Sequence, residues 1–148
     1  MSAGPLRRLS IVALLLLGCT AEAQDNARLL AAIGTVESGM TRKVKGDHGL
    51  AYGAYQQHAR SWVDGNARLA SEGRPTYPLG QWRDATAQDM VAAALLRVIR
   101  DRLKARGIPN PAPEVIALCW NKGVVGAASR NFIPNDYAIR VGNIYRGL

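Results

Sequence analysis

The chain of 148 residues contains few of the side chains that build metal sites or disulfide frameworks. It has only two Cys and two His, fewer than the usual zinc ligand sets require, so we expect no bound metal. Aromatic residues make up only 6% of the sequence, although three of them are Trp. A chain of this length can bury a hydrophobic core without disulfides, and its 48% hydrophobic content excludes disorder as the main state.

The chain also lacks an apolar run long enough to span a bilayer. Its longest run, residues 9–17, is well short of the roughly 20 residues that a membrane-spanning helix needs. Arg7 and Arg8 precede this run and small residues follow it, which is the layout of a secretory signal peptide. We therefore expect residues 1–23 to direct export to the periplasm or the medium. An uncleaved N-terminal anchor is the alternative.

Two cleavage sites compete at the end of this segment. Ala21-Glu22-Ala23 is an A-x-A site that would begin the mature chain at Gln24. The segment before Cys19 resembles a bacterial lipobox, so a lipoprotein signal of residues 1–18 would leave a lipid anchor on Cys19. The sequence leaves both sites open. Residues 24–148 contain no repeat and no linker, which predicts one domain and, we expect, a monomer.

The balance of charge is basic, with 19 Lys and Arg against 11 Asp and Glu. A net charge of +8 favours an anionic partner such as nucleic acid, a membrane surface or an anionic cell wall. Export makes nucleic acid a poor candidate, and no nucleic-acid-binding motif is present. Cys119 follows Ile116-Ala117-Leu118, which predicts a buried apolar thiol and not a nucleophile.

Hydrophobic periodicity predicts a mainly α domain. Leu29, Ile33 and Val36 form one stripe of a helix over residues 26–38, with Asp25 as its cap. Three further helices are expected, over residues 86–106 with a capping box of Thr86 and Asp89, over residues 114–121 before Gly123, and from Asn135-Asp136 onward. Residues 45–58 are rich in Gly and Tyr and predict an irregular or hairpin insertion after the first helix, and residues 71–83 predict a second loop.

Glu37 is an unfavourable residue for its position. It lies in the last turn of the first predicted helix, where the negative end of the helix dipole disfavours a carboxylate. It also follows Val36, near the buried side of that helix. Burial and a negative helix end both raise the pKa of a carboxyl group, and a carboxyl group protonated near neutral pH is what a general acid needs. The alternative is an exposed Glu with its carboxylate in water.

Four short motifs resemble those of lytic transglycosylases and goose-type lysozymes. Glu37-Ser38 resembles their Glu-Ser motif, and Gly53-Ala54-Tyr55-Gln56 resembles Gly-Leu-Met-Gln. Cys119-Trp120-Asn121-Lys122-Gly123 resembles Ala-Tyr-Asn-Ala-Gly, and Tyr137 resembles the Tyr of the C-terminal helix. The motifs occur in the family's order over about residues 27–148, and the ordered set is more specific than any one motif. The resemblance implies a lysozyme-like fold.

The insertion is also similar to invertebrate-type lysozymes and their bacterial relatives. These proteins carry Glu-Ser, then an Asp, then Gly-Pro-Tyr-Gln, and the Asp is their second catalytic carboxylate, which Asp47 matches here. The chain lacks the many Cys of the animal members. It departs from the transglycosylase pattern at Gln57, where an apolar residue is usual, at Trp120, which replaces Tyr, and at Lys122, which replaces Ala.

The resemblance implies cleavage of the β-1,4 bonds between MurNAc and GlcNAc in peptidoglycan, without a cofactor. Glu37 would protonate the leaving oxygen. In a transglycosylase the same carboxylate then acts as base on the sugar's own 6-hydroxyl, whereas in a hydrolase Asp47 serves as nucleophile or activates water. The four matched motifs favour the transglycosylase reaction. Asp47 could instead be a turn residue, and the whole domain could be an inactive peptidoglycan-binding module.

The resemblance also implies a set of substrate-binding residues, most of them with a structural alternative. The alternatives are a hydrogen bond within the loop for Gln56, a helix cap for Asn121, and packing in the core in place of stacking on a sugar for Tyr55, Trp120 and Tyr137. His48 and His58 are simplest as solvated loop residues, and Trp62 and Trp82 as packing residues. The implied substrate-binding residues are Ser38, Tyr55, Gln56, Trp120, Asn121 and Tyr137.

Overall fold

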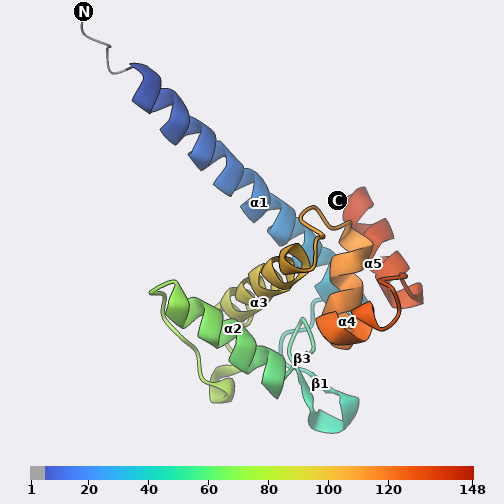
Figure 1. The fold of residues 1–148 in the computed structure, drawn as a ribbon. Helices are drawn as coiled ribbons and strands as arrows, with labels where there is room; N and C mark the ends of the chain where they lie inside the picture. Colours follow the sequence, from blue (N-terminus) through green and yellow to red (C-terminus); the bar gives the residue numbers. More distant parts are fainter. Residues whose placement is uncertain (1–5) are drawn as a thin grey trace, which may run out of the picture.

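The computed structural model describes residues 6–148, with side chains from residue 21 onward. Helices dominate this part of the chain, which confirms the mainly α class (Figure 1). A small three-stranded sheet follows the first helix. The α-helices are α1 (Leu6–Ser38), α2 (Ala59–Ser71), α3 (Ala85–Ala105), α4 (Pro113–Ala128) and α5 (Asp136–Gly147).

The start of α1 differs from the prediction. The helix begins at Leu6 and not at Asn26, so Asp25 lies inside it and is not its cap. The Asp25 carboxylate instead accepts hydrogen bonds from the guanidinium of Arg100 and the phenol of Tyr145, which tie α1 to α3 and α5. The predicted export signal and the lipobox at Cys19 fall largely outside the side chains that are described. No helix in the described part of the chain has both the length and the apolar character that a membrane span requires.

The insertion after α1, predicted as irregular or a hairpin over residues 45–58, forms a small antiparallel sheet of three short strands. Its strands are paired in the order β1-β2-β3, and the register places Lys45 opposite Tyr52 and Ala51 opposite His58. A 3-10 turn, η1 (Asp47–Gly49), joins the first two strands. The strands are β1 (Lys45–Gly46), β2 (Ala51–Tyr52) and β3 (Gln57–His58).

Helix α2 was not predicted, and it packs against α3. Its Trp62 and Leu69 are buried, and Trp62 Nε1 donates a 2.7 Å hydrogen bond to the carbonyl of Tyr77. Gly65 allows the close approach of the two helices, because a Cβ there would lie 2.6 Å from the carbonyl oxygen of Val91. Trp82 is buried in the same cluster, so the interpretation of both Trp residues as packing residues is confirmed.

The beginning of α3 corrects a second prediction. The helix is capped by Asp84, whose side chain accepts a 2.7 Å hydrogen bond from the backbone of Ala87, and not by a box of Thr86 and Asp89. Asp89 instead forms an ion pair with Arg42 at 2.6 Å. The Asp89 carboxylate, which the local sequence assigned to the helix cap, thus binds Arg42, a residue distant in sequence.

The last two helices begin or break near the predicted positions. In α4 the helical geometry is interrupted at Gly123, with φ 71° and ψ 159°, and the chain continues helical to Ala128. This φ lies in the left-handed region that favours glycine. Helix α5 is capped by Asn135, which accepts a 2.9 Å hydrogen bond from the backbone of Ala138.

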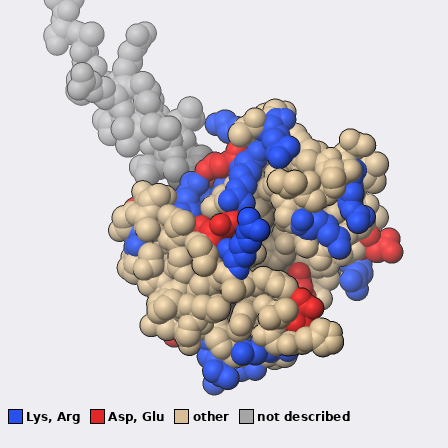
Figure 2. All heavy atoms as spheres, turned by 60° about the horizontal axis from the view of Figure 1, so that its bottom comes forward, with Lys and Arg blue, Asp and Glu red and all other residues tan. Residues whose placement is uncertain are grey.

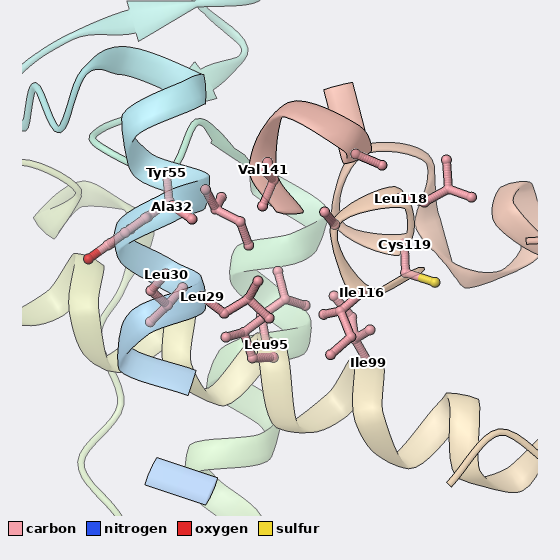
Figure 3. Packing of buried hydrophobic residues seen from close by; sticks show 14 of the residues in the cluster. Leu29, Leu30, Ala32, Tyr55, Leu95, Ile99, Ile116, Leu118, Cys119 and Val141 are labelled. Carbon is pink, nitrogen blue, oxygen red and sulfur yellow. The ribbon is translucent and has the colours of Figure 1, made fainter. Parts of the chain in front are cut away.

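The main core lies between α1, α3, α4 and α5. The predicted stripe of α1 faces it, with Leu29 and Ile33 buried. Figure 3 shows Leu29 near Leu95 of α3, and Ile99 of α3 beside Ile116 of α4. Cys119 is buried in this core, and burial raises the pKa of its thiol to about 11, which confirms the predicted apolar thiol. This packing fixes the C-terminal end of α1 against the sheet, α4 and α5.

Candidate active site

The last turn of α1 places Glu37 on the wall of a cavity of about 400 Å³. The rest of the wall comes from the small sheet, the start of α2, α3 and α4. The other residues of this candidate catalytic-site cavity are Asp47, Ala51, Gln56, Gln57, His58, Ser61, Leu95, Trp120 and Asn121. Two carboxylates that are ten residues apart in sequence therefore face the same space.

The Glu37 carboxyl group is half-buried, and its pKa is raised. Burial is the largest cause and raises its pKa above the ordinary value of 4.5. The hydroxyl of Tyr137 donates a 2.7 Å hydrogen bond to Oε1 of Glu37, and this bond lowers the pKa, as do the charges of His58 and Arg140. The net direction is upward, which agrees with the direction predicted from the sequence. The carboxyl group can thus hold a proton beside an open cavity.

Asp47 lies in the turn between β1 and β2 and also lines the cavity. Its φ of 48° is left-handed, in keeping with the turn that the sequence predicted as the structural alternative. Its carboxylate Oδ2 lies 3.3 Å from Nε2 of His58, and both side chains are about half exposed to solvent. Asp47 is therefore both a turn residue and part of the cavity wall.

His58 is a cavity residue that sequence reasoning missed. It was interpreted as a solvated loop residue, but the pairing of β3 with β2 places it on the wall of the cavity that Glu37 and Asp47 also line. It contacts Asp47 directly, and its charge lowers the pKa of Glu37. Its position two residues after Gln56, the last residue of the second motif, is the signal that could have identified it.

Two of the implied substrate-binding residues support the site from behind. Ser38 donates a 2.7 Å hydrogen bond to the carbonyl of Ala54, which joins the end of α1 to the sheet. Tyr55 is only 4% exposed, and its hydroxyl donates a 2.5 Å hydrogen bond to Asp89. Neither side chain lines the cavity. Of the two interpretations of Tyr55, the structure shows packing in the core, because the ring is enclosed there.

Gln56, Trp120 and Asn121 do line the cavity. Gln56 is held at a left-handed φ of 47°, and its Nε2 donates a 2.9 Å hydrogen bond to the carbonyl of Gly53. A Cβ at position 46 would lie 2.0 Å from Oε1 of Gln56, so a larger residue there would displace the end of the Gln56 side chain. Trp120 Nε1 donates a 3.3 Å hydrogen bond to the carbonyl of Tyr55, which leaves its ring on the cavity wall.

Among the described side chains, Gln57 has the one buried polar group without a hydrogen-bond partner. It is 2% exposed, and its Nε2 has no hydrogen-bond partner. An unsatisfied buried donor costs about 1–3 kcal/mol. The sequence marked this position because an apolar residue is usual there in the resembled families.

A second and larger cavity adjoins the first. It measures about 1060 Å³ and lies between α2, α3 and α4. Five residues line both cavities, so the two form one continuous groove past Trp120. Figure 2 shows a hollow on this face with Lys and Arg side chains beside it. The shared residues are His58, Ser61, Leu95, Trp120 and Asn121.

In the part of the chain that is described, no group of three or more His, Cys, Asp or Glu residues is arranged to hold a metal ion. The side chains that line the two cavities carry carboxyl, imidazole, amide and hydroxyl groups, and the larger cavity adds guanidinium and amino groups. Comparison with known protein families, with curated proteins and with solved structures found no match to the chain.

Proposed function

We propose that this protein is a lysozyme-like glycosidase that cleaves β-1,4 bonds between MurNAc and GlcNAc in peptidoglycan. One observation carries the proposal: the carboxyl group of Glu37 has a raised pKa and lies on the wall of a groove. The motif order in the sequence supports the same substrate class. Export, as the sequence predicts, would bring the protein to its substrate.

The chemistry follows from the position of Glu37. Its carboxyl proton passes to the glycosidic oxygen while the bond from C1 to that oxygen breaks and the electron pair leaves with the oxygen. The positive charge that remains is shared between C1 and the ring oxygen. Glu37 is then ionised, and the hydrogen bond from Tyr137 stabilises the new carboxylate.

The first course is the transglycosylase reaction, which the four sequence motifs favour. The Glu37 carboxylate removes the proton from the 6-hydroxyl of the same sugar, and O6 forms a bond to C1. The product is a 1,6-anhydro sugar, and no water is consumed. In this course Glu37 acts first as acid and then as base, and Asp47 is dispensable for proton transfer.

The second course is hydrolysis, and one observation favours it. Asp47 lines the same cavity as Glu37 and contacts His58, so a second carboxylate is available to the reacting sugar. Asp47 would either attack C1 or accept a proton from an attacking water. The product then carries a reducing end, and one water is consumed.

The test compares the full chain with Glu37→Gln on a suspension of purified cell walls. Wild type should lower the turbidity and release muropeptides, and Glu37→Gln should do so more slowly by at least about 100-fold, the usual contribution of a general acid. Asp136→Asn is the matched control, because Asp136 is exposed and lines neither cavity. An inactive binding module would sediment with the walls and release nothing, and that result would overturn the proposal.

A further inference from the structure

The larger cavity carries the opposite charge to the candidate catalytic-site cavity. Its floor is apolar and includes Leu95, Ile99 and Cys119. Four cationic side chains and one carboxylate, that of Asp64, lie around this floor, and all four cations belong to exposed residues. We call this the cationic cavity, and its cations are Arg60, Arg102, Arg106 and Lys122.

Most of this positive charge has no partner within the protein. Asp64 accepts a 3.1 Å hydrogen bond from Arg102. Arg60, Arg106 and Lys122 form no ion pair with any residue that the structure describes. Other basic residues without an ion pair, such as Lys104 and Arg130, lie outside both cavities, so the cationic cavity differs from them in gathering its charges around one apolar floor. The cationic cavity therefore holds free positive charge.

The cationic cavity is continuous with the site of bond cleavage. The ring of Trp120 and the side chain of Asn121 line both cavities, and Lys122 is the next residue in the chain. A polymer with its scissile bond at Glu37 could therefore extend along the floor of the cationic cavity. The apolar floor suits the faces of sugar rings, and the exposed cations suit charged groups that project away from the polymer.

We propose that the cationic cavity binds the carboxylates of the peptide stems on the glycan strand that Glu37 cleaves, and so selects stem-bearing strands over neutral ones. This inference rests on the proposed function. Lys122 provides its sequence signature, because it stands where the resembled motif has Ala. The peptide stems project sideways from the glycan strand, and the cations surround the floor on which the strand would lie. The carboxylates of the stems therefore complement the unpaired positive charge.

The test measures binding and cleavage by the full chain and by the double variant Lys122→Ala/Arg106→Gln. Three polymers are compared: glycan strands with peptide stems, the same strands after amidase removal of the stems, and a neutral chitin oligosaccharide. The matched control is Lys104→Ala/Arg130→Gln, which removes two exposed charges outside both cavities. Binding is measured in the Glu37→Gln background, and kcat and KM are measured with Glu37 intact.

We expect the double variant to bind stem-bearing strands about tenfold more weakly at low salt, with a raised KM and an unchanged kcat, since two solvent-accessible charge contacts are lost. Added salt should shrink this difference, and neither chitin nor stem-free strands should show it. If the double variant loses as much affinity for stem-free strands, the contacts are to the lactyl carboxylate and not to the stems. If it loses as much affinity for chitin, or if the control variant loses as much for stem-bearing strands, the charges of the cationic cavity have no specific role. Each of these results overturns the inference, whereas failure of wild type to cleave any of the polymers overturns the proposed function itself.

Discussion

The hydroxyl of Tyr137 on α5 donates a 2.7 Å hydrogen bond to Oε1 of Glu37 at the end of α1, across a separation of 100 residues. The bond favours the ionised carboxylate, whereas burial of the same group favours the protonated form. Burial and the nearby carboxylate also raise the pKa of Tyr137, so its hydroxyl remains a donor at any working pH. The pKa of Glu37 is therefore set by two opposed effects, of which burial is the larger.

Removal of this hydroxyl should shift the pH dependence of the reaction. In Tyr137→Phe the pKa of Glu37 should rise further, because a bond to its charged form is lost. A general acid must be protonated, so the alkaline limb of the kcat/KM profile should move to higher pH. Tyr145→Phe is the control. Tyr145 also lies on α5, its hydroxyl is bonded to Asp25 and not to Glu37, and it lines neither cavity. An identical shift in both variants would argue against a specific role for Tyr137.

Glu37 should make the stability of the fold depend on pH. Its pKa in the folded state lies above the ordinary value of 4.5, so the unfolded chain ionises first as the pH rises. Below pH 4.5 the carboxyl group is protonated in both states and has no such effect. Between 4.5 and the folded pKa the native state binds more protons and progressively loses stability.

Glu37→Gln should remove that loss. Its melting temperature should be close to that of wild type at low pH, and its advantage should grow through the window above pH 4.5 and then level off. The measurement is thermal unfolding across this range, with Asp136→Asn in parallel. A difference between Glu37→Gln and wild type that is independent of pH would contradict the burial of the carboxyl group.

The products of the reaction should depend on the role of Asp47. From the four matched motifs we expect 1,6-anhydro muropeptides, and a loss of less than about tenfold in Asp47→Asn, because Glu37 alone then moves the protons. Mass spectrometry of the released muropeptides checks both points. Reducing-end products, heavier by one water, together with an inactive Asp47→Asn would establish the hydrolytic course.

Substitution by Leu should have opposite effects on the free energy of unfolding at Gln57 and at its neighbour Gln56. Gln57→Leu removes a buried donor that lacks a partner, so the free energy of unfolding should rise by about 1 kcal/mol or more. Gln56→Leu removes a hydrogen bond to Gly53 and should lower it by about 1 kcal/mol. Denaturant unfolding of the two variants checks the pair. A destabilised Gln57→Leu would show that the amide has an acceptor in solution.

Short-range pattern was enough to predict several elements. The stripe of Leu29 and Ile33 is buried as its helical spacing requires, because burial of a helix face repeats with the helical turn. Asn135 caps the last helix, since an Asx side chain reaches the backbone three residues on. The sheet in residues 45–58 follows from Gly residues that permit its turns. The raised pKa of Glu37 was predicted from its place at a helix end beside an apolar stripe.

Other features escaped local reasoning because distant groups decide them. Helix α2 includes Gly65 and Asn66, which favour helix weakly, and its formation is stabilised by packing on α3. The capping box at Thr86 and Asp89 failed because Arg42 and Tyr55, brought in from the preceding segments, take the Asp89 carboxylate. A competing partner that is close only in the folded state cannot be read from adjacent residues.

The sequence by itself determined the class of fold, the order of the motifs and the direction of the pKa shift of Glu37, since each depends on residues near one another in the chain. Tertiary structure alone decided that Tyr137 reaches Glu37, that His58 lies beside Asp47, and that the chain encloses a groove with opposite charges in its two halves. These relationships arise where α1, the sheet and α5 meet across a shared core. Their distances depend on how the helices pack, and side-chain packing is a property of the whole folded chain.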